Sequence, residues 1–90
     1  MMLACKSAME KVASFLVVLS QRTGNPIGDY TTFSLAMSRA DIADFLGLTV
    51  ETVSRMLTRL RRQGTITLET PKTVLVLDME SLINASQTDD

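Results

Sequence analysis

Two short amphipathic helices separated by a single glycine constrain this chain more than any other feature of its sequence. Ser38 and Asp41 have the spacing of a capping box, which predicts that a helix begins there. Gly47 can adopt a positive φ without a Cβ clash and so ends that helix, and Thr49 is suited to cap the next one. Only a tight turn fits between the two helices, so the sequence predicts a helix-turn-helix over residues of about 38–63.

Each of the two helices has one apolar face with the spacing of an amphipathic helix. The apolar residues of the first helix, expected to face the core, are Ile42, Ala43, Phe45 and Leu46. Those of the second helix lie at i, i+3, i+4 and i+7 and are Val53, Met56, Leu57 and Leu60. The second helix therefore buries one stripe and exposes the opposite face. The residues of that outward face are Val50, Glu51, Ser54, Arg55, Thr58, Arg59 and Arg62.

The outward face of the second helix places Glu51 one turn before Arg55. A carboxylate there can accept from a cytosine amino group, and a guanidinium can donate two hydrogen bonds to O6 and N7 of guanine. The same spacing also fits an ordinary surface ion pair that carries no function. Because the pair begins the second helix of a helix-turn-helix, we favour sequence-specific reading of duplex DNA in the major groove.

Charge is segregated along the chain. The net charge is −1 and the isoelectric point is near 5.3, values that do not by themselves indicate a nucleic-acid binder. The segment between Glu51 and Glu69 contains no acidic residue, and its four arginines give it a charge of +4. This segment can face phosphates, although arginines near the end of a helix also stabilise its macrodipole.

Downstream of the second helix the apolar period changes from 3.6 to 2. Ile66 and Leu68 alternate with threonines, a turn follows at 69–72, and a β-branched apolar run comes next. The pattern predicts a β-hairpin over residues 65–77, which forms the wing of a winged helix when it follows a recognition helix. Lys72 at the hairpin tip is placed to touch a phosphate beside the groove. A purely structural hairpin that covers the core is the alternative.

The remaining segments complete one small α+β domain, mainly α-helical, that spans residues 1–90. The other predicted elements are a helix at about 7–21, a loop at 27–30, a short strand at 32–37 and a helix at 79–85 capped by Asp78. Phe15 and Val18 widen the apolar stripe of the first of these helices. The short strand is expected to join the wing hairpin in an antiparallel sheet of about three strands.

Several kinds of site are absent from the sequence. It has no histidine and one cysteine, Cys5, so it can build neither a structural zinc site nor an internal disulfide, and we expect no metal and no cofactor. No glycine-rich phosphate loop or activated nucleophile is present. Asp41 and Asp44 could be taken as a catalytic carboxylate pair, but capping and the helix dipole explain them better. We therefore assign no catalytic residue and expect a protein that is not an enzyme.

The chain also lacks the features of exported and membrane proteins. Its longest apolar run, near 15–19, is too short to span a bilayer, and its first residues lack the charged region and long apolar block of a signal peptide. Cys5 is expected to be a packed thiol rather than a redox sensor. These observations predict a single cytoplasmic domain.

Two blocks of sequence, 37–43 and 48–55, closely resemble the DNA-binding half of the Crp/Fnr superfamily of bacterial transcription regulators, and its Fnr/FixK branch in particular. The resemblance covers nearly all of the chain. It implies that Glu51, Ser54 and Arg55 read the bases of a TTGAT-like half-site, with Arg55 on the guanine. Matching positions and the outward helix face together provide the candidate phosphate-binding residues, which are Arg39, Thr49, Thr52, Thr58, Arg59, Arg62 and Lys72.

The resemblance has implications beyond this domain. Members of the superfamily usually carry an N-terminal sensory β-roll and a long dimerisation helix, so the sensory domain and its effector site are expected to be absent here. A full-length homodimer would bind a palindromic operator, and a contact with RNA polymerase through residues 24–30 is implied by analogy. Val50 stands where the cyclic-AMP-responsive branch has arginine, which argues against a cyclic-AMP-type operator. A winged helix that docks a protein partner instead of DNA is the alternative.

Overall fold

The computed structural model describes residues 6–87, which contain four helices and four strands. The helices are α1 (Ala8–Thr23), α2 (Arg39–Leu46), α3 (Val50–Arg62) and α4 (Met79–Ser86). The strands are β1 (Asn25–Ile27), β2 (Tyr30–Ser34), β3 (Ile66–Thr70) and β4 (Thr73–Val76). The predicted α+β class and the winged helix-turn-helix arrangement are confirmed. The expectation for Cys5 lies outside the described residues.

The turn between α2 and α3 forms where the capping pattern predicted it. The Ser38 hydroxyl accepts from the Asp41 amide at 3.1 Å, which satisfies one of the amides at the start of α2. The aspartate carboxylate makes no return bond to the serine or to any other described residue, so only half of the predicted capping box is present. Gly47 adopts φ 72° and ψ 35°, the left-handed conformation that ends α2 and reverses the chain.

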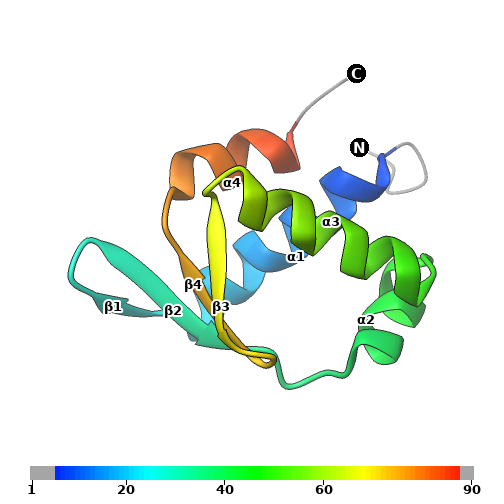
Figure 1. Cartoon of the computed structure of the whole chain (residues 1–90), viewed down its shortest axis with the longest axis horizontal. Coiled ribbons are helices and arrows are strands. Elements are labelled where there is room, and N and C mark those ends of the chain that lie inside the picture. Colours follow the sequence, from blue (N-terminus) through cyan, green and yellow to red (C-terminus); the bar gives the residue numbers. More distant parts are fainter. Residues whose placement is uncertain (1–5, 88–90) are drawn as a thin grey trace.

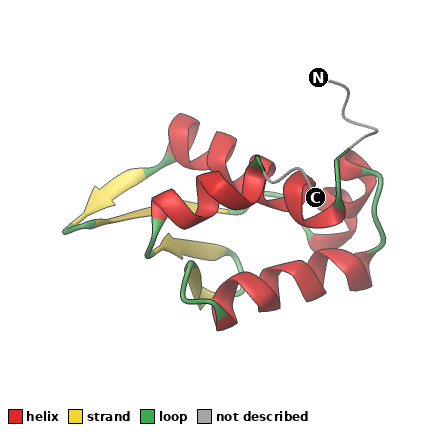
Figure 2. Ribbon diagram, turned by 90° about the horizontal axis from the view of Figure 1, so that it is seen from above, coloured by secondary structure: helices red, strands yellow, loops and turns green. Residues whose placement is uncertain are grey.

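A single apolar core joins the four helices to one face of the sheet. Its fully buried side chains include Leu16 of α1, Leu60 of α3, Val74 of β4 and Leu82 of α4. The predicted stripe of α3 is buried in full. In Figures 1 and 2, α1 packs behind α3 and α4 lies along α1. Helix α1 contacts β2 and α3 contacts β3, whereas α2 lies away from the sheet and the β1–β2 hairpin projects beyond the helices. This packing leaves the far side of α3 uncovered.

Phe45 departs from the prediction that α2 buries it. Its side chain is 68% exposed, while the other three residues of the predicted stripe are buried. On a helix of 3.6 residues per turn those three side chains span an arc of about 100°, and position 45 falls about 60° outside that arc. The Phe45 ring instead lies against Phe15 of α1, with ring centroids 5.9 Å apart. Val18, expected to widen the stripe of α1, is likewise 45% exposed.

The sheet has four antiparallel strands in the order β1-β2-β4-β3, so the prediction of about three strands was wrong. The residues expected to form a loop at 27–30 end β1, make a two-residue turn at Gly28 and Asp29, and begin β2. Strand β1 was not predicted because its three residues are all exposed. Without a buried face, the strand does not need alternating apolar and polar residues. Strand β2 pairs with β4 as predicted, but it ends at Ser34 rather than at Met37.

The two outer helices also begin at N-caps. Ser7 and Glu10 form a complete capping box before α1, in which the Ser7 hydroxyl accepts from the Glu10 amide at 3.1 Å and the Glu10 carboxylate accepts from the Ser7 amide at 2.6 Å. This helix was predicted at about 7–21, but its capping box was not predicted. Asp78 caps α4 as predicted. Its hydrogen bonds from the backbone amide and the hydroxyl of Ser81 lower the pKa of its carboxyl group.

Replacing Gly47 by alanine is expected to lower the free energy of unfolding by about 1–2 kcal/mol, the cost of giving a left-handed residue a Cβ. Lack of space is not the cause, because the atom nearest to an added Cβ is Lys11 Nζ at 3.9 Å. Gly47→Asn is the matched control and should cost less, since asparagine tolerates the left-handed region. Urea unfolding followed by circular dichroism measures both variants. Equal losses would contradict the conformational explanation.

Candidate nucleic-acid interface

The outward face of α3 is determined by what the opposite face buries. Thr49 caps the helix, because its hydroxyl accepts from the Thr52 amide at 3.1 Å and donates to the Thr52 hydroxyl at 2.9 Å. Val53 and Leu60 are both 0% exposed, so α3 cannot rotate about its axis without exposing its apolar stripe. All the residues predicted for the outward face are exposed, namely Val50, Glu51, Ser54, Arg55, Thr58, Arg59 and Arg62.

The three residues predicted to read bases lie on the first two turns of α3. Glu51, Ser54 and Arg55 are exposed, and Figure 1 shows this end of α3 beside α2 and away from β3 and β4. Neither Glu51 nor Arg55 forms a hydrogen bond or ion pair through its side chain with another described residue, so the ordinary surface ion pair is not formed. The acceptors of the Glu51 carboxylate and the donors of the Arg55 guanidinium are therefore unused among the described residues, as contacts to base edges would require.

Positive charge continues along α3 beyond the three residues that are predicted to read bases. The exposed arginines of the helix are Arg55, Arg59, Arg61 and Arg62. The last three lie in the final turn, where their charge also stabilises the helix dipole. Arg61 was not among the predicted phosphate-binding residues, although it belongs to the same arginine run. It borders a hollow of about 420 Å³ between α3 and the start of β3, lined also by Ile66 and Thr67.

Two long-range hydrogen bonds tie the wing hairpin β3–β4 to the helix-turn-helix. Arg39, the first residue of α2, donates from Nη2 to the Pro71 carbonyl at 2.9 Å, and the Leu35 amide donates to the Lys72 carbonyl at 2.6 Å. At the tip, the Lys72 amide donates to the Thr70 hydroxyl at 3.1 Å. These bonds bring the hairpin tip to the start of α2. Two predicted phosphate-binding residues, from distant parts of the sequence, therefore lie at the same end of the domain.

The predicted phosphate-binding threonines differ in how their hydroxyl groups are already used. Thr58 donates to the Ser54 carbonyl at 2.9 Å, and Thr49 donates to the Thr52 hydroxyl. The half-buried Thr52 hydroxyl donates to no other described residue. In this arrangement the hydroxyl hydrogen of Thr52 is unused among the described residues, whereas Thr49 and Thr58 use theirs within the domain.

Residues 6–87 contain neither a metal-binding cluster nor a membrane-spanning helix. Within that range, no three His, Cys, Asp or Glu side chains lie close enough together to hold a metal ion. Among the same residues, no helix combines the length and the apolar character needed to cross a membrane. The exposed row of polar and cationic groups along α3 is the surface that the predicted DNA contacts require.

Comparison with known proteins assigns this geometry to a family. Residues 10–85 match the Crp-like helix-turn-helix domain. The chain belongs to that family. This Crp-like chain is 52% identical over 83 residues to the nitrogen fixation regulation protein FixK of Azorhizobium caulinodans, and 38% identical over 93 residues to the transcriptional activator protein FnrL of Cereibacter sphaeroides. It also resembles the structure of FixK2 from Bradyrhizobium japonicum, with a TM-score of 0.82, 37% identity and coverage of 96% of this chain and 41% of that one.

The Crp-like chain spans about a third of the length of these curated relatives. The alignments cover 91% and 99% of this chain but only 34% of FixK and 38% of FnrL. They confirm the predicted resemblance to the Fnr/FixK branch. Both relatives are named as regulators, which also confirms the prediction that the chain is not an enzyme.

Removing the Arg39 side chain is expected to loosen the wing. Arg39→Ala deletes the donor to the Pro71 carbonyl, so the order parameter of the Lys72 amide in nitrogen-15 relaxation should fall from a rigid value toward about 0.6 or lower. Arg62→Ala is the matched control, because its guanidinium makes no bond to a described residue, and it should leave the wing unchanged. The same Lys72 order parameter in both variants would show that the Arg39 bond does not hold the wing.

Proposed function

We propose that this Crp-like domain binds double-stranded DNA in a sequence-specific manner, as part of a bacterial transcription regulator, with α3 in the major groove. The observation that supports this most directly is the exposed row of Glu51, Ser54 and Arg55 on a helix whose opposite face is buried. A recognition helix has to present its first residues to base edges without a covering element. The names of the relatives, a regulation protein and a transcriptional activator, agree with this function.

The chemistry of the three exposed side chains suits a half-site that resembles TTGAT. Arg55 donates two hydrogen bonds to O6 and N7 of the guanine, and Glu51 accepts from a cytosine amino group. Ser54 can donate or accept, so it contacts either kind of base edge. A good bidentate contact discriminates against the wrong base by about 1–3 kcal/mol, which makes Arg55 the main source of specificity in this proposal.

Phosphate contacts are proposed on both sides of the base-reading residues. Arg59 and Arg62 follow them along α3, Arg39 and Lys72 lie at the wing, and Thr52 offers a free hydroxyl hydrogen. The net charge of −1 does not oppose this binding, because the cations gather on the segment that would face the DNA. Each neutralised phosphate releases counterions, so the affinity should fall steeply as the salt concentration rises.

Two further partners belong to the proposed regulator as a whole. Acting as a homodimer, it would place two α3 helices about 34 Å apart on a palindromic operator. The hairpin β1–β2, on which Ile27 and Tyr30 are exposed, is the proposed contact with RNA polymerase. This hairpin projects at the end of the domain opposite α2 (Figure 1), so a protein bound there would not compete with the start of α3 for DNA.

Arg55→Ala and Lys72→Ala should weaken DNA binding in different ways. Arg55→Ala should cost about 1–3 kcal/mol on a TTGAT-containing duplex and much less on random duplex, because it removes a base contact. Lys72→Ala should weaken both duplexes alike and reduce the slope of log K against log salt by about 1, because it removes a phosphate contact. Fluorescence anisotropy titrations at several salt concentrations measure both effects. If the unaltered domain binds both duplexes equally weakly, a winged helix that docks protein partners becomes the better explanation.

A dimer of the Crp-like domain should bind a palindrome far more tightly than the single domain does. Joining two copies through a leucine-zipper segment should raise the affinity by about 10² to 10⁴, because the second half-site is then bound intramolecularly. Gel-shift titration compares the fused and single forms on a palindrome. The control duplex has its half-sites moved by half a helical turn, which puts them on opposite faces of the DNA. Equal affinities of the fused and single forms would contradict dimeric binding.

A further inference from the structure

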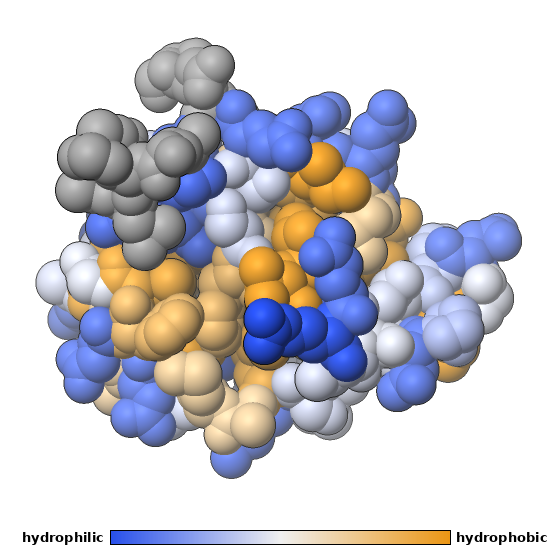
Figure 3. Space-filling model, turned by 180° about the vertical axis from the view of Figure 1, so that it is seen from behind, coloured by the Kyte–Doolittle hydropathy of each residue, from blue (hydrophilic) through white to orange (hydrophobic). Residues whose placement is uncertain are grey.

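An apolar strip crosses the face of the domain that lies opposite α3. The strip consists of Phe15, Val18 and Leu19 of α1, Phe45 of α2 and Met37 before α2. Phe45 and Val18 are its two exposed members, the other three are half-buried, and the Phe45 ring contacts Phe15. Figure 3, seen from behind relative to Figure 1, shows apolar side chains gathered over this face. Contiguous exposed apolar side chains mark an interaction surface, whereas isolated ones do not.

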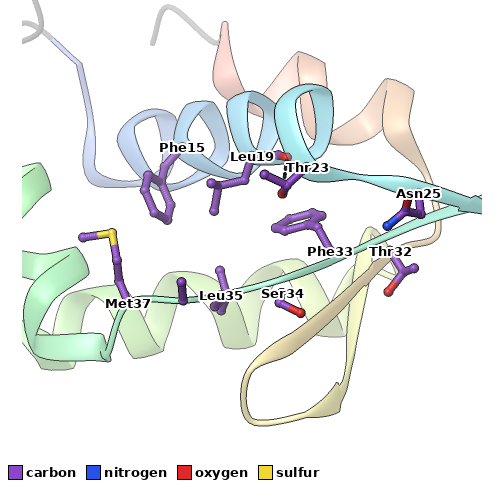
Figure 4. Close-up of a pocket in the computed structure, with 10 residues that line it drawn as sticks. Phe15, Leu19, Thr23, Asn25, Thr32, Phe33, Ser34, Leu35 and Met37 are labelled. Atoms are coloured by element: carbon purple, nitrogen blue, oxygen red, sulfur yellow. Dashed lines mark hydrogen bonds between the residues drawn. The ribbon is translucent and has the colours of Figure 1, made fainter.

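The apolar strip has a hollow on each side. Phe15 and Leu19 line both hollows, so they form the ridge between them. The hollow between α1 and α2 has a volume of about 380 Å³, and the hollow between α1 and the segment that follows β2 has a volume of about 500 Å³. In Figure 4, Phe15 and Met37 point toward each other across the second opening. This shape accepts side chains that are spaced along one face of a helix.

The charged residues around the apolar strip indicate which kind of partner it can bind. Lys11 and Arg22 border the hollow between α1 and α2, and neither side chain bonds to another described residue. No acidic residue lines either hollow, and Asp41 and Asp44 of α2 are not part of them. A second copy of the chain would bring the same cations together, which disfavours self-association through the strip. An acidic partner would instead pair with both cations.

We propose that the apolar strip docks an amphipathic helix of a separate protein, with apolar anchors on one face and acidic residues on its flanks. The anchors, at about i, i+3 or i+4 and i+7, enter the two hollows beside Phe15 and Leu19. Carboxylates on the flanks of the helix meet Lys11 and Arg22. The strip and α3 lie on opposite faces (Figures 1 and 3), so the domain holds this partner and DNA at the same time.

The test is a fluorescence anisotropy titration of the 90-residue chain with a synthetic helical peptide. The peptide has about 20 residues, with leucines along one face and glutamates on its flanks, and a second peptide carries lysines in place of the glutamates. The acidic peptide should bind with a Kd of about 1–100 μM, at least about tenfold more tightly than the basic one. Saturating duplex DNA should leave this affinity within about twofold, because α3 takes no part in peptide binding.

Substitutions in the apolar strip test whether the peptide binds there. Phe45→Ala and Val18→Ser should each weaken binding of the acidic peptide at least about fivefold, since interface anchors carry most of the binding energy. The side chains of Phe45 and Val18 are 68% and 45% exposed and neither belongs to the buried core, so circular dichroism should show an intact fold. Ile27→Ala is the matched control, because it removes a side chain of 52% exposure from β1, and it should change the affinity less than about twofold. The double variant Lys11→Glu with Arg22→Glu should bind the basic peptide more tightly than the acidic one.

Four results would overturn the proposal. The first is that the acidic peptide does not bind, and the second is that the acidic and basic peptides bind equally well. The third is that the strip variants and Ile27→Ala lose the same amount of affinity for the acidic peptide. The fourth is that duplex DNA displaces the peptide. Sedimentation velocity adds a fifth, because a dimer that disappears in Phe45→Ala would assign the strip to a second copy of the chain.

Discussion

The burial of one face of α3 is the interaction on which the rest of the arrangement depends. Val53 and Leu60 are completely buried, and Met56 and Leu57 are nearly so. A fully buried side chain of this kind contributes about 1.5–3 kcal/mol, so the stripe holds the helix in one rotation against α1 and α2. The residues that point away from the core are thereby determined as well. The position of Glu51 and Arg55 on the surface is a consequence of packing on the other side of the helix.

Hydrogen bonds over long sequence distances position the parts that the core does not reach. The bonds from Arg39 to the Pro71 carbonyl and from the Leu35 amide to the Lys72 carbonyl set the wing tip against the start of α2. The domain consequently has two faces of different chemistry. One presents the cationic helix α3 and the wing, and the other presents the apolar strip around Phe15. The proposed binding of DNA and the proposed binding of a helical partner use one face each, so the two surfaces can be occupied independently.

The helix-turn-helix could be predicted because its determinants are local. The hydroxyl groups of Ser38 and Thr49 cap amides three residues away, and Gly47 needs no tertiary contact to adopt its left-handed conformation. Strand β1 could not be predicted in the same way. Its pairing with β2 depends on a two-residue turn. Its side chains all face solvent, so its sequence does not alternate between apolar and polar residues as that of a half-buried strand does. Phe45 was placed wrongly because an apolar residue at the edge of a helix face is compatible with either environment.

The sequence by itself determined the periods of the helices and strands, the caps that begin them and the segregation of arginines along α3. These depend on interactions within a few residues of the chain. Only the tertiary structure decided that the Arg39 side chain bonds to the wing and that the exposed Phe45 ring packs at a tilt against Phe15. Those contacts join residues about 30 positions apart in sequence. Which residues meet in these contacts depends on how the helices and the sheet pack, and no local sequence pattern predicts it.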